Sequence, residues 1–323
     1  MDAPERWGMP LAGAAGGSAD GIALEAGLAV GAPEWVEAEG AEGQPSSYWG
    51  RCWRRFLVDR LAVAALVGLL VVAALAVLAP WIAPASATDG DVALRLAPIG
   101  TPGHILGTDE QGRDMLTRLL HGARLTLLAG IVPVLAAGFI GGALGIIAGH
   151  FRGLPNTIIM RTMDVFYAFP AILLAIGLAA ALGPGLRNAI IALLVVWIPP
   201  VVRVAETITR RVAVQEFIEA AQASGATPWQ IIRYHVAGNV AGPVFVYAST
   251  LFGVSIVFAA GLSFLGLGVA PPTAEWGLML ASLKDAIYTN PAVAALPGAA
   301  IFFISVAFNL VSDGLRDALD VRL

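Results

Sequence analysis

Residues 215–239, with the sequence QEFIEAAQASGATPWQIIRYHVAGN, form the longest polar run between two apolar segments in the second half of the chain. Three polar side chains recur at every third position and share one helical face: Glu216, Glu219 and Gln222. Three apolar side chains lie on another face, so the pattern predicts a short amphipathic helix: Phe217, Ile218 and Ala221. The chemistry expected of the polar face is a charge-assisted hydrogen bond, made by Glu219 either to another protein or back to its own loop.

A glycine break follows this helix. Gly225 is predicted to end it with a positive φ angle, which glycine adopts without steric cost. Thr227 then suits the N-cap of a second helix, and Pro228 suits its first position. The sequence therefore predicts a docking block made of a helix, a glycine stop and a second helix.

The other candidates for chemistry do not form a catalytic set. A phosphate-binding loop needs a lysine after a glycine-rich turn, and Lys284, the only lysine, lies outside any such motif. The four histidines are scattered and form no HExxH motif, which argues against a zinc hydrolase: His104, His121, His150 and His235. Three serines in apolar segments are expected to bond to backbone carbonyls rather than act as nucleophiles: Ser255, Ser263 and Ser305. We therefore expect a protein without enzymatic activity, cofactor or metal, whose energy comes from a partner.

The composition indicates a polytopic membrane protein. Hydrophobic residues make up 58% of the chain and charged residues only 13%, against about 25% charged residues in soluble domains. Apolar runs of about 20 residues predict an all-α protein with six crossings. These are expected at 61–78, 125–148, 157–182, 187–204, 240–268 and 292–311.

Glycine and proline shape the expected spans. Repeated small-residue spacing gives the second span a face for close helix approach: Gly138, Gly141, Gly142, Gly145 and Gly149. Prolines are expected to end the first span at Pro80 and Pro84, to kink the third at Phe169-Pro170, and to break or bend the fourth at Pro199-Pro200.

The basic residues predict the orientation. Of the 19 lysines and arginines, thirteen fall on the side that contains residues 215–239 and six on the other. Positive charge is concentrated on cytoplasmic loops, so the polar segment and both termini are expected in the cytoplasm. Residues 1–50 hold eight acidic residues and one basic residue, which predicts a disordered cytoplasmic tail, with a partner-binding arm as the alternative. The single cysteine, Cys52, excludes an intramolecular disulfide.

The chain is therefore expected to have four regions: the tail at 1–50, a first span with its basic flank at 51–79, an outer connection at 80–122, and a five-helix core at 123–323 that contains 215–239.

The outer connection contains the string Gly107-Thr108-Asp109-Glu110-Gln111-Gly112-Arg113-Asp114. This string predicts a capped helix entry, with Thr108 or Asp109 as the cap and Arg113 paired with Asp114.

Several of these segments resemble a known family. Glu219-Ala220-Ala221 followed by Gly225 resembles the EAA loop of ABC importer permeases, although Ala237-Gly238 stands where that family usually has Leu-Pro. The LGTDEQGRD string at 106–114 resembles the segment before the second span of dipeptide and oligopeptide permeases. Further segments resemble the second, C-type membrane subunit of the dipeptide, oligopeptide and nickel permeases: 264–268, 271–272, 276–277, 307–310 and 313–317.

The resemblance implies a type I ABC importer permease in the bacterial inner membrane. It also implies a second membrane permease subunit, two cytoplasmic ATPase subunits or domains that bind ATP and Mg, an external binding protein, a peptide substrate and surrounding membrane lipid, but no nucleic acid. The residues expected to contact the ATPase are Glu216, Phe217, Glu219, Ala220, Ala221, Ser224, Gly225 and Ala226.

Two alternatives stay open at this point. The first is a nickel importer of the same family. The second is a stand-alone secondary transporter, which needs titratable groups within its spans. Only Asp164 and Glu206 are candidates, and both lie near arginines, Arg161 and Arg203, with which they are expected to form interfacial ion pairs.

Overall fold

The computed structural model describes residues 48–319, so the acidic tail expected at 1–50 lies almost entirely outside the described part. Within that part the chain is helical and contains no strand, which confirms the all-α prediction. The helices are α1 (Tyr48–Val58), α2 (Arg60–Ile82), α3 (Met115–His150), α4 (Leu154–Tyr167), α5 (Ala171–Leu182), α6 (Leu186–Val212), α7 (Glu216–Ala223), α8 (Pro228–Ile231), α9 (Ala237–Phe264), α10 (Trp276–Ser282) and α11 (Pro291–Ala318).

Five helices are long and apolar enough to cross a membrane: α2, α3, α6, the helix Pro228–Phe264 and α11. A sixth crossing requires α4 and α5 together, which meet at 90°. The bend falls at the predicted Phe169-Pro170 position, because a residue before proline is disfavoured in helical conformation. It is a break between two half-length helices and not the kink in one helix that was expected.

Prolines inside the other spans do not end them. Pro80 lies inside α2, which continues to Ile82, and Pro199-Pro200 lie inside a continuous α6. Membrane helices tolerate proline because neighbouring helices and local adjustments satisfy the freed backbone groups. α2 therefore ends between the two prolines that were expected to end it, and α6 is not broken.

The second helix of the 215–239 segment is the beginning of a membrane span. α8, a π turn at Ile232–Val236 and α9 together form one helix of 37 residues, Pro228–Phe264. The helix that contains the fifth span therefore starts at Pro228, twelve residues before the apolar segment expected from residue 240, and the second helix of the docking block is continuous with that span. The π turn directly precedes Ala237-Gly238, where the resembled family has Leu-Pro.

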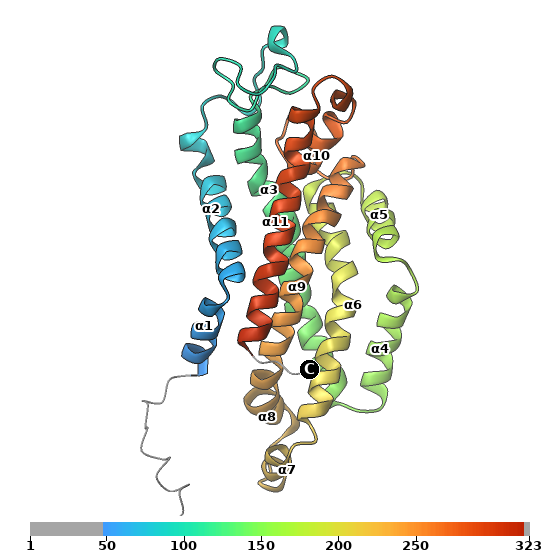
Figure 1. Ribbon diagram of the computed structural model, residues 1–323. Helices are drawn as coiled ribbons and strands as arrows, with labels where there is room; N and C mark the ends of the chain where they lie inside the picture. The colour runs from blue at the N-terminus through green and yellow to red at the C-terminus, as the bar shows by residue number, and fades with distance from the viewer. Residues whose placement is uncertain (1–47, 320–323) are drawn as a thin grey trace, which may run out of the picture. The chain divides into compact units, whose positions relative to one another are not determined.

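α3, α6 and α9 pack against one another at the centre of the bundle. Figure 1 places α2 at one edge beside α11, and the bent pair α4–α5 at the opposite edge beside α6. α3 packs against both α6 and α9, and the five glycines divide between these neighbours: Gly141, Gly145 and Gly149 face α6, while Gly138 and Gly142 face α9. The single small-residue face expected from the sequence is therefore two faces.

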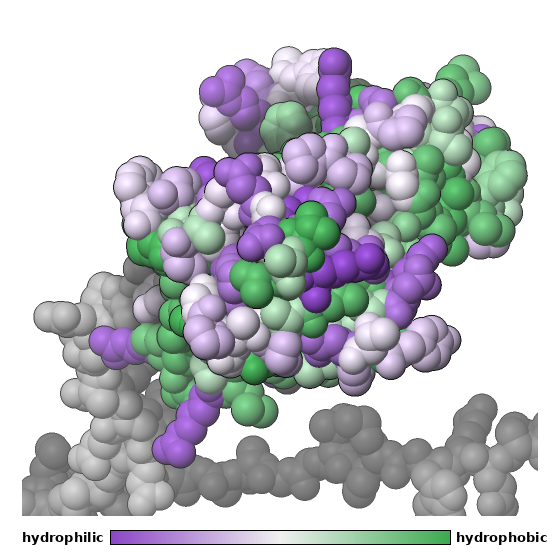
Figure 2. All heavy atoms as spheres, turned by 90° about the horizontal axis from the view of Figure 1, so that it is seen from above, coloured by the Kyte–Doolittle hydropathy of each residue, from purple (hydrophilic) through white to green (hydrophobic). Residues whose placement is uncertain are grey.

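The two ends of the bundle are built differently. The α7 end holds α1, α7, α8 and the last turn of α11, and the α10 end holds α10 and residues 83–114 (Figure 1). Seen from above in Figure 2, hydrophilic and hydrophobic residues are intermixed on the surface of the molecule. On the spans, large apolar side chains point outward, such as Phe139 (82% exposed) and Phe302 (71% exposed). Such side chains are stable in contact with lipid.

Candidate functional site

α7 is fixed to the bundle by one side of the helix. Ile218 is fully buried against a cluster from α6, α8 and α9 that includes Val201, Ile208 and Val240. Ala221 packs at the edge of the same cluster. Burying a side chain such as isoleucine contributes about 1.5–3 kcal/mol, which holds this eight-residue helix in place. α7 is thus a fixed projection from the bundle.

The glycine stop has the geometry expected from the sequence. Gly225 has φ +81°, and its N–H donates to the carbonyl of Gln222 at 2.9 Å. The N–H of Ala226 donates to the carbonyl of Ala221 at 3.1 Å. These two bonds form a Schellman motif, in which a left-handed residue satisfies the last helix carbonyls.

The helix that follows starts as predicted. The Thr227 side chain accepts from the backbone N–H of Gln230, and the Gln230 side chain accepts from the backbone N–H of Thr227 at 2.8 Å. This reciprocal pair is a capping box, and Pro228 occupies the first helical position. The prediction for Thr227 and Pro228 is confirmed.

The opposite side of α7 faces solvent. Glu216, Glu219, Ala220 and Ser224 are exposed. Within residues 48–319, neither the Glu216 nor the Glu219 carboxylate has an ion-pair or hydrogen-bond partner. Both carboxylates are therefore available for a contact with another molecule.

Phe217, one of the three residues of the expected apolar face, is not buried as Ile218 is. Its side chain is 44% exposed, and its ring lies 6.2 Å from the ring of His235. Three further large side chains around α7 are exposed and were not identified from the sequence: Val214 (59%), Trp229 (63%) and Tyr234 (69%). We call Val214, Glu216, Phe217, Glu219, Trp229 and Tyr234 the α7 surface.

A buried polar cluster lies where the ends of α3, α4 and α6 meet, close to the point where α6 leads to α7. Glu206 of α6 is almost fully buried, and its carboxylate pairs with Arg210 and accepts a 2.9 Å hydrogen bond from Asn156 of α4. The same Asn156 amide donates to the carbonyl of Ala148 in α3 at 2.9 Å. The cluster therefore joins the ends of three helices near the point where α6 leads into α7.

An ion pair also joins α4 to α6. Asp164 accepts from Arg203 at 2.7 Å and lies 3.6 Å from Arg161. The Arg203 guanidinium also stacks 4.5 Å from the centre of the Tyr167 ring. The expected Arg161–Asp164 pair is present, whereas Glu206 pairs with Arg210 and not with Arg203.

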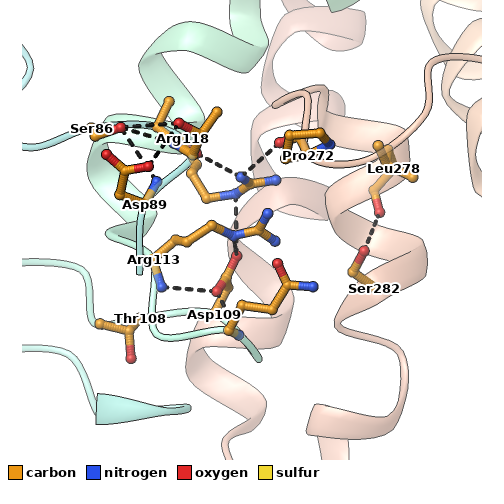
Figure 3. Close-up of polar contacts among 12 residues, drawn as sticks. Ser86, Asp89, Thr108, Asp109, Arg113, Arg118, Pro272, Leu278 and Ser282 are labelled. Atoms are coloured by element: carbon orange, nitrogen blue, oxygen red, sulfur yellow. Dashed lines mark hydrogen bonds and ion pairs between the residues drawn. The ribbon is translucent and has the colours of Figure 1, made fainter. Parts of the chain in front are cut away.

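At the α10 end, the 107–114 string forms a buried ionic cluster (Figure 3). Asp109 accepts from Arg113 Nε at 2.6 Å and lies 3.2 Å from Arg118 Nε. Arg118 also donates to the carbonyls of Ala87 and Pro272, so it joins three segments of the α10 end.

The roles expected for this string are partly wrong. Asp114, and not Thr108 or Asp109, caps α3 by accepting from the backbone N–H of Thr117 at 2.8 Å. Arg113 pairs with Asp109 and not with Asp114, while Thr108 accepts from the backbone N–H of Ala97 at 2.8 Å. Asp114 instead contacts His104 at 3.0 Å.

A buried glutamate attaches α10 to α3. The Glu275 carboxylate caps α10 through the backbone N–H groups of Gly277 and Leu278, and it accepts from the Thr126 hydroxyl at 3.0 Å. The Trp276 indole donates to the carbonyl of Leu119 at 2.9 Å. Glu275 therefore has a structural role, because its carboxylate oxygens already accept hydrogen bonds from α3 and α10.

Two protein-family models match the chain. The model described as binding-protein-dependent transport system inner membrane component matches residues 141–323, which include α7 and the polar contacts between α4 and α6. The model described as the N-terminal TM domain of oligopeptide transport permease C matches residues 47–98. Together they include all six expected crossings in whole or in part.

Curated relatives match over most of their length. A glutathione transport system permease protein of Pectobacterium atrosepticum is 42% identical, over 85% of this chain and 91% of its own. A di/tripeptide transport system permease protein of Pseudomonas aeruginosa is 40% identical, over 84% and 91%. A probable D,D-dipeptide transport system permease protein of Escherichia coli is 40% identical, over 81% and 88%.

Among solved structures, the MetNI methionine ABC transporter in an inward-facing conformation contains a chain with a TM-score of 0.48 and 21% identity. The match covers 62% of this chain and 97% of that chain.

Proposed function

This chain belongs to the family of binding-protein-dependent transport system inner membrane components, and from that premise we propose that it is a membrane subunit of an ATP-driven importer of short peptides. Because the members of this family are transport permeases of the inner membrane, this chain is one as well. The peptide cargo rests on the three relatives, whose names specify glutathione, itself a tripeptide, di/tripeptides and D,D-dipeptides.

The observation that carries the proposed mechanism is the α7 surface. On α7, which Ile218 holds against the bundle, two carboxylates have no partner within residues 48–319 and Phe217 is exposed. Trp229 and Tyr234 are exposed on the helix that follows. Exposed aromatic groups with charges around them are typical of protein interfaces. We assign ATPase contact to Glu216, Phe217, Glu219, Ala220, Ala221, Ser224, Gly225 and Ala226, with Val214, Trp229 and Tyr234 added.

The remaining partners follow from the same proposal. Two ATPase subunits or domains bind ATP and Mg, because the sequence has no phosphate-binding lysine motif. A second permease subunit completes the membrane path, and an external binding protein delivers the peptide. This chain itself is non-catalytic and acts by transmitting the movement of the ATPases from α7 to α6 and α4.

The proposed orientation places the α7 end in the cytoplasm. Many arginines lie in elements at this end, including Arg54, Arg152, Arg211, Arg233 and Arg316. An excess of positive charge marks cytoplasmic loops. Both termini and the acidic tail are then cytoplasmic, and the α10 end faces the binding protein.

Neither alternative from the sequence is favoured. The relatives are permeases for peptides and glutathione, which does not favour nickel as the cargo. A secondary transporter needs titratable groups for ion coupling, whereas Asp164 and Glu206 are both paired with arginines.

The complete transporter in proteoliposomes tests the proposal. We expect ATP-dependent uptake of dialanine that requires loaded binding protein, and we expect Glu219→Lys to abolish the stimulation of ATP hydrolysis by that protein. Asp317→Lys is the matched control, since it reverses another exposed carboxylate near the same end of the bundle. No peptide uptake by the unsubstituted complex would contradict the peptide cargo. Normal stimulation in Glu219→Lys would contradict the role of Glu219.

A further inference from the structure

Two adjoining pockets lie along α6, between α4 and α9. They have volumes of about 280 and 320 Å³ and share three lining residues: Tyr167, Pro200 and Tyr247. We call the combined space the α6 groove. One part is apolar and aromatic, with Phe166, Phe169 and Trp197 among its lining residues. The other part contains the side chains of Arg203, Thr207 and Arg211.

The arginine part of the groove suits a carboxylate. A guanidinium has five N–H donors. Within residues 48–319, Asp164 is the only hydrogen-bonding partner of the Arg203 guanidinium, through one nitrogen, and the Tyr167 ring stacks on it. Asp164 also pairs with Arg161. When Arg211 is included, three positive charges are therefore balanced by one carboxylate. Because positive charge is in excess here and the Arg203 guanidinium has further N–H donors, it can form a bidentate hydrogen bond with an additional carboxylate.

The aromatic part suits an ammonium group. Pro199 and Pro200 have no N–H, so the carbonyls of Val195 and Val196 lose their donors within the helix. Val196 lines this part of the groove, next to Trp197. Main-chain acceptors and aromatic faces both attract a cation. The prolines that α6 accommodates without breaking therefore provide acceptors beside the groove.

The separation of the two parts matches a short peptide. Val196 and Arg203 are seven residues apart in α6, which corresponds to about 10 Å along the helix axis. Three extended peptide residues also span about 10 Å. A tripeptide can therefore place its ammonium at one part and its carboxylate at the other, and a dipeptide, which spans about 7 Å, is reached by the long side chain of Arg203.

We propose that the α6 groove binds the peptide in transit, with the C-terminal carboxylate on Arg203 and the N-terminal ammonium between the Val196 carbonyl and the aromatic side chains. This assignment rests on the proposed function, since it specifies where the imported peptide lies within this subunit. Asp164 and Tyr167 hold the guanidinium in place for that contact.

Protection of an introduced thiol tests occupancy of the groove without requiring transport. Thr207→Cys places a thiol in the arginine part, in a Cys52→Ser background that removes the only native cysteine. We expect dialanine to slow the reaction of that thiol with a methanethiosulfonate reagent at least about threefold in the assembled complex, which corresponds to a peptide concentration of about twice the Kd. Dialaninamide, which lacks the carboxylate, is expected to protect less. Thr162→Cys on α4, which is exposed but outside the groove, is the control for general effects.

The role of Arg203 is tested in the same background. Adding Arg203→Gln should abolish the difference between dialanine and dialaninamide, and Arg203→Lys should restore part of it, since lysine keeps the charge but not the fork. Arg161→Gln is the matched control, because Arg161 contacts the same Asp164 from outside the groove. Equal modification rates with and without dialanine, or a difference that survives in Arg203→Gln, would overturn the inference. Uptake by the unsubstituted complex is measured in parallel: peptide uptake without protection contradicts the groove alone, whereas no uptake contradicts the proposed function.

Discussion

Gly225 determines where α7 stops, and its role is conformational. A Cβ at this position would meet nothing within 4 Å, so a substitution is opposed by the positive φ alone. Valine in a left-handed conformation costs about 1–2 kcal/mol, whereas asparagine visits it routinely. The strain of Gly225→Val therefore falls on the last turn of α7 and leaves the membrane core intact.

We predict that Gly225→Val leaves the abundance of the protein in the membrane unchanged and lowers the stimulation of ATP hydrolysis by loaded binding protein. Gly225→Asn should retain most of that stimulation. Abundance and ATPase stimulation are measured together. A parallel loss of abundance in Gly225→Val would indicate that the stop serves stability, while equal stimulation in both variants would show that the shape of this turn does not matter for coupling.

Asp109 stabilises the α10 end because it is the carboxylate between two buried arginines. Removing one partner of a buried ion pair typically costs about 3–5 kcal/mol, since the other charge is left uncompensated. We predict that Asp109→Asn lowers the thermal unfolding midpoint of the purified complex markedly. Glu110→Gln, one residue away and without an ion pair in the described part of the chain, should leave the midpoint unchanged. Equal midpoints for the two variants would contradict this role.

At the residue scale, local signals were predictable and tertiary pairings were not. The positive φ of Gly225 and the cap at Thr227 depend on backbone sterics and hydrogen bonds within five residues, which the sequence contains. The choice of Asp109 over Asp114 as partner of Arg113 depends on a loop that brings Arg118 to the same carboxylate. Exposure of Phe217 depends on which side of α7 meets α6 and α9, and its position next to Ile218 does not determine this.

At the element scale, α3 approaches α6 closely enough to require glycine at the contact. A Cβ on Gly145 would lie 2.4 Å from the Cβ of Ala205 and 2.6 Å from the carbonyl oxygen of Val202. The equivalent distance for Gly138, to Ala248 on α9, is 3.6 Å, which is an ordinary contact. Two glycines of one helix thus differ in whether a methyl group fits.

We predict that Gly145→Ala destabilises the protein by about 1–3 kcal/mol through overpacking, whereas Gly138→Ala does not. Both changes add one methyl group to the same helix, so helix propensity is matched. Thermal unfolding of the purified complex and protein abundance in the membrane measure the effect. Similar midpoints for the two variants would mean that α3 and α6 separate at little cost, contrary to the packing described.

The boundaries of the spans were harder to predict than their number. Hydropathy locates each crossing, because about 20 apolar residues are needed whatever the neighbours are. It does not show that α8 continues into α9 through a π turn, since the polar residues 228–239 lie beyond the apolar window. A proline in the sequence also does not show whether the helix breaks there. Pro170 separates two helices that meet at 90°, whereas Pro199-Pro200 lie within one continuous helix.

At the scale of the whole molecule, polar interactions at the two ends do different work. The α10 end is bound into one unit by Asp109, Arg118 and Glu275, all of them buried. The α7 end instead presents carboxylates without partners in the described residues, beside a cluster in which Glu206 and Asn156 join α6 to α4. A rigid end and an end open to a partner suit a subunit that receives substrate on one side and mechanical force on the other.

The orientation of the bundle gives the last prediction. If the basic residues place the α7 end in the cytoplasm, positions at the two ends must react from opposite sides of the membrane. Gln222 on α7 and Tyr288 near α10 are both exposed, and Cys52 is buried and replaceable by serine. We predict that in intact cells an impermeant thiol reagent modifies Tyr288→Cys but not Gln222→Cys, each in the Cys52→Ser background. Permeabilising the inner membrane should then allow the reagent to modify Gln222→Cys.

Both single-cysteine proteins must first support peptide uptake, which ensures that the labelled molecules are assembled. Modification of Gln222→Cys in intact cells would reverse the orientation and exclude α7 from contact with a cytoplasmic ATPase. Modification of both positions would place the two ends on one side and contradict the single crossing, Pro228–Phe264, that separates Gln222 from Tyr288.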